Sequence, residues 1–176
     1  HVYLEDKLKL VALNSILYDS INLFKIKSID DDKQMKWLNQ TLYNSLINNE
    51  TVWILNHIPI GDGESTEYYN NTLSNILEKY SSIIKLNLYG HNHEDNFKLY
   101  KKNDKFFSSV LISASIVPNN HDPCFRVYKY DTKTYDVLDY VQYCANLTKA
   151  NENNVLKYEE TYSFNQAYNT KNLSLE

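Results

Sequence analysis

The first ninety residues alternate between short apolar runs and longer amphipathic stretches, and this alternation restricts the fold more than any other feature of the sequence. Three compact apolar runs that end in polar residues predict buried strands, within residues 8–15 (LKLVALNS), 51–59 (TVWILNHIP) and 81–93 (SSIIKLNLYGHNH). The stretches between them repeat apolar residues at helical spacing. The order strand, helix, strand, helix, strand predicts a parallel sheet with helices packed on it.

The two amphipathic stretches begin with residues that are typical of helix caps. The first has aspartates at 30–32 and then apolar residues at three- and four-residue spacing through residues 35–46. We interpret these aspartates as a solvated helix cap and not as a metal site. The second follows a glycine-rich turn, repeats its apolar residues through 69–80, and has Ser65 as its expected cap.

Beyond the third strand the sequence changes to short aromatic and β-branched runs separated by turn residues, without helices between them. Such runs predict antiparallel strands. In the tail, Val155, Tyr158 and Tyr162 lie close to helical spacing and predict a small helical extension. Trp37, in the first helix, and Trp53, in the second strand, are expected to be core aromatics.

The composition indicates a globular chain and excludes several classes of function. A chain of 176 residues with 43% hydrophobic residues can bury a sizeable core without a disulfide scaffold. Its net charge of −4 offers no basic surface for nucleic acid. No apolar run approaches the roughly 20 residues that cross a bilayer. Because the sequence opens on HVYLEDKLKL, without a Met or a signal peptide, we expect it to start within a longer protein.

Three of the five histidines follow the ends of two predicted strands. His57 comes just after one strand, and His91 and His93 come after the next. Because ligands gather beyond the carboxyl ends of the strands in such sheets, we expect the three imidazoles to meet there. Residues two apart on an extended segment point the same way, roughly 6.5–7 Å apart, which suits two ligands of a metal pair. Each histidine alone reads more simply as a satisfied polar residue, but their combination favours a metal site.

The residues next to these histidines fit the same interpretation. Gly90 lacks a Cβ where we expect the backbone to turn sharply. Neutral imidazole suits zinc, iron or manganese, and a ligating histidine normally donates its other ring N–H to a carboxylate or a carbonyl. Glu94 or Asp95 could supply that carboxylate.

The two segments that contain these histidines resemble a known family. WILNHIPIGDGE, residues 53–64, and LYGHNHEDNF, residues 88–97, look like the last two metal-binding blocks of the calcineurin-like metallophosphoesterases, and specifically of the acid sphingomyelinase-like phosphodiesterases. LVALNSILY, QMKWLNQTL, SASIVPNNHDPCFRVYKYD and YVQYCANLTKAN follow in the order of that family. The resemblance therefore covers nearly the whole chain.

The resemblance implies an α/β fold that is part of a four-layer α-β-β-α sandwich. Residues 1–140 would form the C-terminal half of the metallophosphoesterase domain, and residues 141–176 would form the family's helical C-terminal segment. The site would hold two divalent metal ions, typically zinc, with His93 as a ligand of one ion and His57 and His91 as ligands of the other. The family's earlier Asp-x-His, Gly-Asp and Asn-His blocks do not occur ahead of His57. No general acid can therefore be assigned, and we expect this chain alone to be inactive.

The sequence departs from the family pattern at Asn56 and Cys124, where the family usually has glycine. Cys124 and Cys144 could form a disulfide in an oxidising compartment, or they could be two buried thiols. Asn120 and His121 lie on a loop where members of the family contact substrate, although an exposed loop without that role is the plainer interpretation.

Glycosylation sequons would suit a secreted or lysosomal chain, as the resemblance also implies. They occur at Asn39, Asn49, Asn70, Asn146 and Asn172. An asparagine-rich sequence also produces such sequons by chance.

The resemblance implies metal-dependent hydrolysis of a small phosphodiester, of the nucleotide or the sphingomyelin type, by the complete protein. The stretch from Val127 to Asn151 is most similar to the subgroup that acts on nucleotides and related small phosphodiesters. One alternative is a non-catalytic remnant that serves as a binding or structural piece. A polyphosphatase is a further alternative, although NLTKAN, residues 146–151, argues against it.

Overall fold

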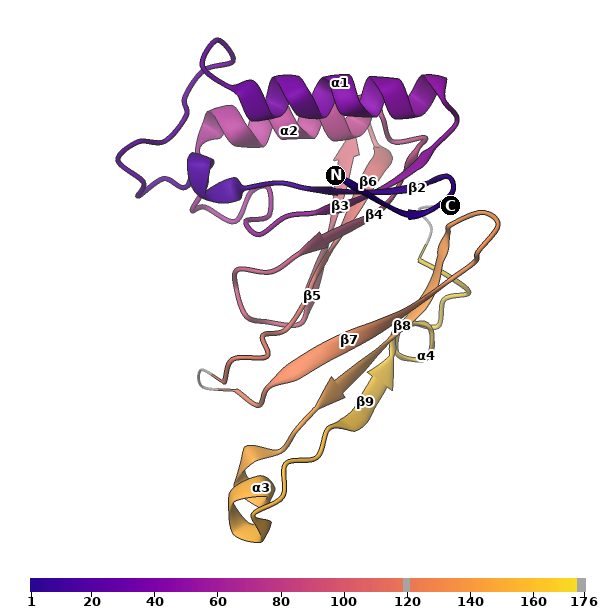
Figure 1. Cartoon of the computed structure of the whole chain (residues 1–176). Coiled ribbons are helices and arrows are strands. Elements are labelled where there is room, and N and C mark those ends of the chain that lie inside the picture. The colour runs from indigo at the N-terminus through magenta and orange to yellow at the C-terminus, as the bar shows by residue number, and fades with distance from the viewer. Residues whose placement is uncertain (119–120, 174–176) are drawn as a thin grey trace.

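The computed structural model describes residues 1–118 and 121–173 and has a mixed α/β fold, as the sequence predicts. Two helices cover one face of a six-stranded sheet, and a three-stranded sheet packs against its other face (Figure 1). The described elements thus form a helix layer and two sheet layers. The fourth layer of the sandwich stays a prediction.

The larger sheet has the strand order β1-β2-β3-β4-β6-β5. Its strands are β1 (Val2–Glu5), β2 (Leu8–Ala12), β3 (Thr51–Leu55), β4 (Ile84–Tyr89), β5 (Asn96–Lys102) and β6 (Lys105–Ile112). β2, β3, β4 and β6 are parallel, and β1 and β5 are antiparallel edges. The three parallel strands predicted from the sequence are confirmed. β6 pairs antiparallel with β5 as expected, but it also pairs in parallel with β4, because β5 takes the outer edge and leaves the place beside β4 to β6.

The helices α1 (Lys33–Ile47) and α2 (Glu67–Lys79) pack on the first face of this sheet through their apolar stripes. The core that they bury includes Val11, Leu38, Leu42, Ile54, Leu73 and Leu77. The side chain of Thr66, and not that of Ser65, caps α2 by accepting a hydrogen bond from the Tyr69 N–H. The Ser65 hydroxyl instead donates to Asn70 Oδ1 at 2.8 Å.

The cap of α1 is buried, so the prediction of a solvated cap was wrong for Asp32. Its Oδ1 accepts the Met35 N–H at 2.9 Å, and its two oxygens accept the hydroxyls of Tyr18 and Tyr68, each at 2.9 Å. Burial raises the pKa of Tyr68 to about 12, with Asp32 adding to the effect, so this hydroxyl remains a donor. Tyr18 ends the short 3-10 helix η1 (Ser15–Tyr18) and Tyr68 lies in α2, and the two segments close over the carboxylate.

The smaller, antiparallel sheet consists of β7 (Cys124–Tyr130), β8 (Val137–Cys144) and β9 (Glu159–Ser163). Its inner face and α4 (Phe164–Tyr168) bury a second core against the larger sheet, formed by Leu8, Trp53, Leu86, Leu111, Val137, Tyr140 and Phe164. Trp53 is 8% exposed, as predicted for a core aromatic. Trp37 is 38% exposed and stacks on His1, so it was wrongly predicted as a core residue.

The tail differs from the predicted helical extension. Val155 lies in a loop, and Tyr162 lies in β9, where it pairs with Gln142 of β8. Two short helices, α3 (Leu147–Asn153) and α4, flank this strand. The near-helical spacing was misleading because β8 offers Tyr162 a strand partner, which a local pattern does not reveal. The proposed boundary between residues 140 and 141 falls inside β8.

Cys124 and Cys144 form a disulfide, so of the two possibilities left open for them the structure contains the bridge. The two residues are directly opposite each other on β7 and β8.

Glycosylation of the chain stays a prediction. Asn49 is exposed, whereas the side chains of Asn39, Asn70 and Asn146 accept hydrogen bonds within the chain. Within residues 1–118 and 121–173, no helix has the length and apolarity that crossing a membrane requires.

Candidate metal-binding edge

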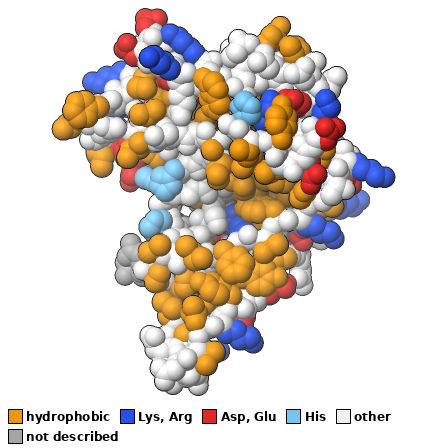
Figure 2. Space-filling view, in the orientation of Figure 1, with side chains coloured by type: hydrophobic (Ala, Val, Ile, Leu, Met, Phe, Trp, Pro, Cys, Tyr) orange, Lys and Arg blue, Asp and Glu red, His pale blue; other side chains and the backbone are white. Residues whose placement is uncertain are grey.

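The loops that follow β2, β3 and β4 meet at the carboxyl ends of these parallel strands. Between them lies a cavity of about 360 Å³, lined by Leu13, Asn14, Ser15, Ile16, Asp19, His57, Ile58 and His91. Ser15 joins two of the loops, because its hydroxyl accepts the Ile58 N–H at 3.0 Å. Figure 2 shows imidazole groups gathered at this edge, where the surface is hollowed between the upper and lower parts of the molecule.

His57 and His91 lie together at this edge, as the sequence predicts. His57 Nε2 is 3.3 Å from His91 Nδ1, and the two rings are nearly perpendicular, at 82°. Two nitrogens bound to one tetrahedral zinc ion at about 2.0–2.1 Å are separated by about 3.3–3.4 Å. The two histidines therefore have the separation of two ligands of a single ion.

Asn56 holds His57 in place. Its Oδ1 accepts the His57 N–H at 2.9 Å, and its Nδ2 donates to the Tyr69 hydroxyl at 2.8 Å. Burial lowers the pKa of His57, and the neighbouring His91 and His93 lower it further. His57 thus favours the neutral form, which is the form that binds a metal.

The carboxylates next to His91 come from residues 61–64 (GDGE), and not from Glu94 or Asp95 as predicted. Glu64 Oε2 lies 2.8 Å from His91 Nε2, and Asp62 Oδ2 lies 3.9 Å from the same nitrogen. When Nε2–H donates to Glu64, the lone pair of His91 is on Nδ1, which faces His57. Asp62 Oδ2 is buried and has no hydrogen-bond partner among the described residues.

Glu94 and Asp95 lie elsewhere. Glu94 is exposed, and Asp95 bonds to Arg126 and to Tyr162. The sequence did contain a signal for the correct carboxylates, because GDGE follows His57 within one of the segments that carry the family resemblance.

The backbone after β4 is not extended, contrary to the prediction for His91 and His93. Both residues have left-handed backbones, with φ of 83° and 63°, which is unfavourable for a residue with a Cβ. The rings consequently face different partners. Gly90 does not make the turn, and a Cβ built on it would lie at an ordinary 3.5 Å from His57 Nδ1. Strained residues of this kind concentrate at functional sites.

His93 lies beside His121 and not in the pair formed by His57 and His91. The rings of His93 and His121 are perpendicular, with centroids 6.2 Å apart. His121 Nδ1 lies 3.0 Å from the Asp122 carbonyl oxygen, to which it donates, so Nε2 is the acceptor; that nitrogen is buried and has no hydrogen-bond partner in the part of the chain that the structure describes. Asn120, the other predicted substrate contact, is outside the described residues.

The arrangement fits part of a metal site. Over residues 1–118 and 121–173, no group of three or more His, Cys, Asp or Glu side chains is arranged to hold a metal ion. Two histidine nitrogens at ligand separation fit an incomplete ligand set, and the two carboxylates near His91, those of Glu64 and Asp62, lie on the Nε2 side of its ring. The structure pairs His57 with His91 and places His93 beside His121, since the backbone turns at His91 and at His93.

Comparison with known proteins gives one consistent result. Residues 103–176 match the model of the acid sphingomyelin phosphodiesterase C-terminal region. The chain is 33% identical over 184 residues to the human cyclic GMP-AMP phosphodiesterase SMPDL3A, covering 96% of this chain and 41% of that protein. It is 30% identical over 177 residues to sphingomyelin phosphodiesterase 1 of Caenorhabditis elegans, covering 96% of this chain and 31% of that protein.

A third relative, sphingomyelinase phosphodiesterase C of Dictyostelium discoideum, is 29% identical over 187 residues, covering 94% of this chain and 42% of the relative. The chain therefore spans less than half the length of these relatives, and it matches a C-terminal portion of them. Its similarity to them extends over almost all of its own length, and it belongs to the acid sphingomyelinase-like phosphodiesterase family.

Proposed function

We propose that this chain is the C-terminal part of a metal-dependent phosphodiester hydrolase and supplies one edge of its metal site. The observation that carries the proposal is the 3.3 Å separation of His57 Nε2 and His91 Nδ1 at the carboxyl ends of neighbouring parallel strands. The names of the relatives support the reaction class, since all three proteins compared above are called phosphodiesterases.

The site would hold two divalent ions, with zinc as the best match to imidazole nitrogens. His57 and His91 would bind one ion and His93 the other, while the longer protein would supply the remaining ligands and the general acid. When bound, two such ions clamp the phosphoryl oxygens and activate a water as the nucleophile.

The neighbouring residues of this chain would orient the ligands. Glu64 would accept the Nε2 proton of His91 and so keep its Nδ1 free, and Asn56 would fix the backbone of His57. Substituting partners of this kind typically weakens metal binding by about 10- to 100-fold.

The substrate would be a small phosphodiester bound beside the cavity that Asn14, Ile16 and Asp19 help to line. We favour a nucleotide-type substrate over sphingomyelin, because the human relative is named a cyclic GMP-AMP phosphodiesterase and the stretch from Val127 to Asn151 resembles that subgroup. In this scheme His121 Nε2 would accept a hydrogen bond from the substrate, with Asn120 on the same loop as a second contact.

A secreted or lysosomal location is part of the proposal. The Cys124–Cys144 disulfide supports it, because disulfides persist mainly in oxidising compartments.

The test is hydrolysis of bis(p-nitrophenyl) phosphate by the full-length protein that contains this segment. We expect turnover that a chelator abolishes and zinc restores, and a loss of at least about 100-fold in His91→Ala. His1→Ala is the control, because His1 stacks on Trp37 and belongs to no part of the site. Turnover that is unaffected by the chelator or by His91→Ala would contradict the proposal, and a wild-type protein without turnover would favour the non-catalytic remnant.

A further inference from the structure

The histidine loop, residues 90–95, receives little backbone support from the described residues. Among residues 1–118 and 121–173, its backbone hydrogen bonds outside strands and helices are Gly90 N–H to His57 O, Asn92 N–H to Gly90 O, and Ser115 N–H to His93 O, each at 3.2 Å. Strained residues such as His91 and His93 persist only where the surrounding structure over-determines them. Something beyond the loop must therefore hold it.

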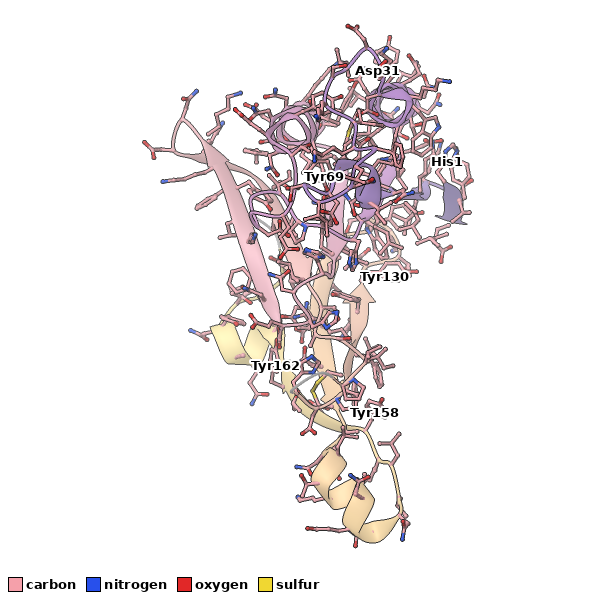
Figure 3. The ribbon with its side chains drawn as sticks, turned by 90° about the vertical axis from the view of Figure 1, so that its left-hand side faces the viewer. His1, Asp31, Tyr69, Tyr130, Tyr158 and Tyr162 are labelled. Atoms are coloured by element: carbon pink, nitrogen blue, oxygen red, sulfur yellow. A yellow bond between two sulfur atoms is a disulfide. The ribbon has the colours of Figure 1, made fainter. Side chains whose placement is uncertain are left out.

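The side chain of Asp95, at the end of this loop, is held through both of its oxygens. Oδ1 pairs with Arg126 Nη2, and Oδ2 accepts the Tyr162 hydroxyl at 2.5 Å. Arg126 belongs to β7 and Tyr162 to β9, so both contacts come from the three-stranded sheet. Figure 3 shows Tyr162 at the lower end of β5, where the larger sheet meets the smaller one.

Arg126 is itself fixed by the small sheet. Its side chain is 1% exposed, its Nε donates to Gln142 Oε1 at 3.2 Å, and its guanidinium lies 4.3 Å from the ring centre of Tyr140. The Tyr140 and Tyr162 hydroxyls are hydrogen-bonded at 3.0 Å. Leaving a buried guanidinium without its carboxylate costs free energy. Moving Asp95 away from Arg126 is therefore unfavourable, and this keeps Asp95 in place.

We propose that Arg126 and Tyr162 are positioning residues that hold His91 and His93 in place through Asp95. The inference rests on the proposed function in one respect, namely that these histidines bind metal. Arg126, Tyr140 and Tyr162 all lie within residues 103–176, which match the family's C-terminal region. We call the contacts of Asp95 with Arg126 and Tyr162 the clamp. Through the clamp, the C-terminal region holds the histidine loop, which belongs to the preceding part of the chain.

The first test measures amide hydrogen exchange in the 176-residue chain and in three variants. Tyr162→Phe removes one hydroxyl, and Arg126→Met removes the charge at similar length. Glu78→Gln is the control, because it breaks an exposed ion pair with Lys102 at the far end of β5. We expect at least tenfold faster exchange at the hydrogen-bonded amides of Gly90, Asn92 and Ser115 in the first two variants, with the control and the amides of α1 unchanged. Unchanged exchange at these three amides in Tyr162→Phe would overturn the clamp, even if Arg126→Met fails to fold.

The second test follows the imidazole nitrogens by NMR and the binding of zinc alone by calorimetry. Both clamp variants should shift the ring resonances of His91 and His93 and leave that of His1 unchanged, and they should bind zinc at least fivefold more weakly. Arg126→Lys, which keeps the charge but not the planar fork, should recover part of this loss. Ring resonances and zinc affinity that match the wild type in both variants would overturn the clamp. A wild-type full-length protein that binds no zinc, together with faster exchange in the variants, would overturn the proposed function and leave the clamp standing.

Discussion

An ion pair with a buried cation lies on each face of the six-stranded sheet, and the two pairs differ in what they hold. On the helix face, Lys9 Nζ lies 2.6 Å from Glu50 Oε2 and joins β2 to the segment that follows α1. Between the sheets, Arg126 pairs with Asp95 and joins β7 to the histidine loop. The first pair is remote from the histidines and fixes the scaffold, whereas the second is attached to the candidate site. Buried charge in this protein therefore serves the fold on one face and the site on the other.

The largest expected effect comes from breaking the pair on the helix face. Lys9→Met leaves Glu50 buried without its cation and should lower the free energy of unfolding by about 3–5 kcal/mol. Urea denaturation measures the loss, and Lys7→Met is the matched control because Lys7 is exposed. The comparison predicts normal exchange at the amides of Gly90, Asn92 and Ser115 in the folded Lys9→Met protein. Faster exchange there would show that the ion pair on the helix face also supports the histidine loop.

The disulfide between β7 and β8 should have the next largest effect. Replacing Cys124 and Cys144 together with Ala should lower the free energy of unfolding by about 2–4 kcal/mol, since the bridge closes a loop of moderate length. Because the bridge anchors the end of β7 that precedes Arg126, exchange in the histidine loop should also rise. Thermal unfolding with and without reductant checks the stability. A loss of stability with no change in the amide exchange of that loop would show that the bridge stabilises the fold without supporting the loop.

The pH dependence of stability should report on the helix-face pair. Burial acts to raise the pKa of Glu50, but hydrogen bonds from Lys9, Tyr3 and Ser45 outweigh it and lower the pKa below its usual 4.5. The unfolded state therefore takes up the proton first, so this contribution is present above about pH 4.5 and is lost as the pH falls further. Urea denaturation between pH 6 and 3 should show a smaller decline in Lys9→Met/Glu50→Leu. An equal decline would mean that the pair does not titrate as the contacts suggest.

The smallest effect is expected for Trp37, on the outer side of α1. Trp37→Ala should change the free energy of unfolding by no more than about 0.5 kcal/mol, because the side chain is 38% exposed and lies outside the clusters of buried residues. Trp53→Ala, in the core between the sheets, should cost about 3–5 kcal/mol when measured in the same way. Similar losses in the two variants would contradict the assignment of Trp37 to the surface.

The parts of the fold that the sequence predicted are those with local periodic patterns. β2, β3, β4, α1 and α2 lie where the apolar runs and stripes placed them. The parallel pairing of β6 and the strand character of Tyr162 could not be predicted, since each depends on a partner strand distant in sequence. Trp37 was misplaced because a helical stripe leaves the orientation of its flanking residues undecided.

The candidate site was predictable to a similar degree. That His57 and His91 meet follows from their positions after neighbouring parallel strands. The separation of His93 from them depends on two left-handed residues that no glycine marks. Glu64 and the Arg126–Asp95 pair were missed because loop folding and sheet packing, and not sequence spacing, bring these side chains together.

The central claim is that His57 and His91 bind one metal ion together, and zinc calorimetry on the full-length protein that contains this segment tests it most directly. We expect the wild type and His1→Ala to bind zinc alike. His57→Ala and His91→Ala should each weaken binding by at least about 100-fold, and the double variant should lose little more, since two ligands of one ion are not independent. Zinc binding that survives either single substitution, or that falls in two separate steps, would contradict the account.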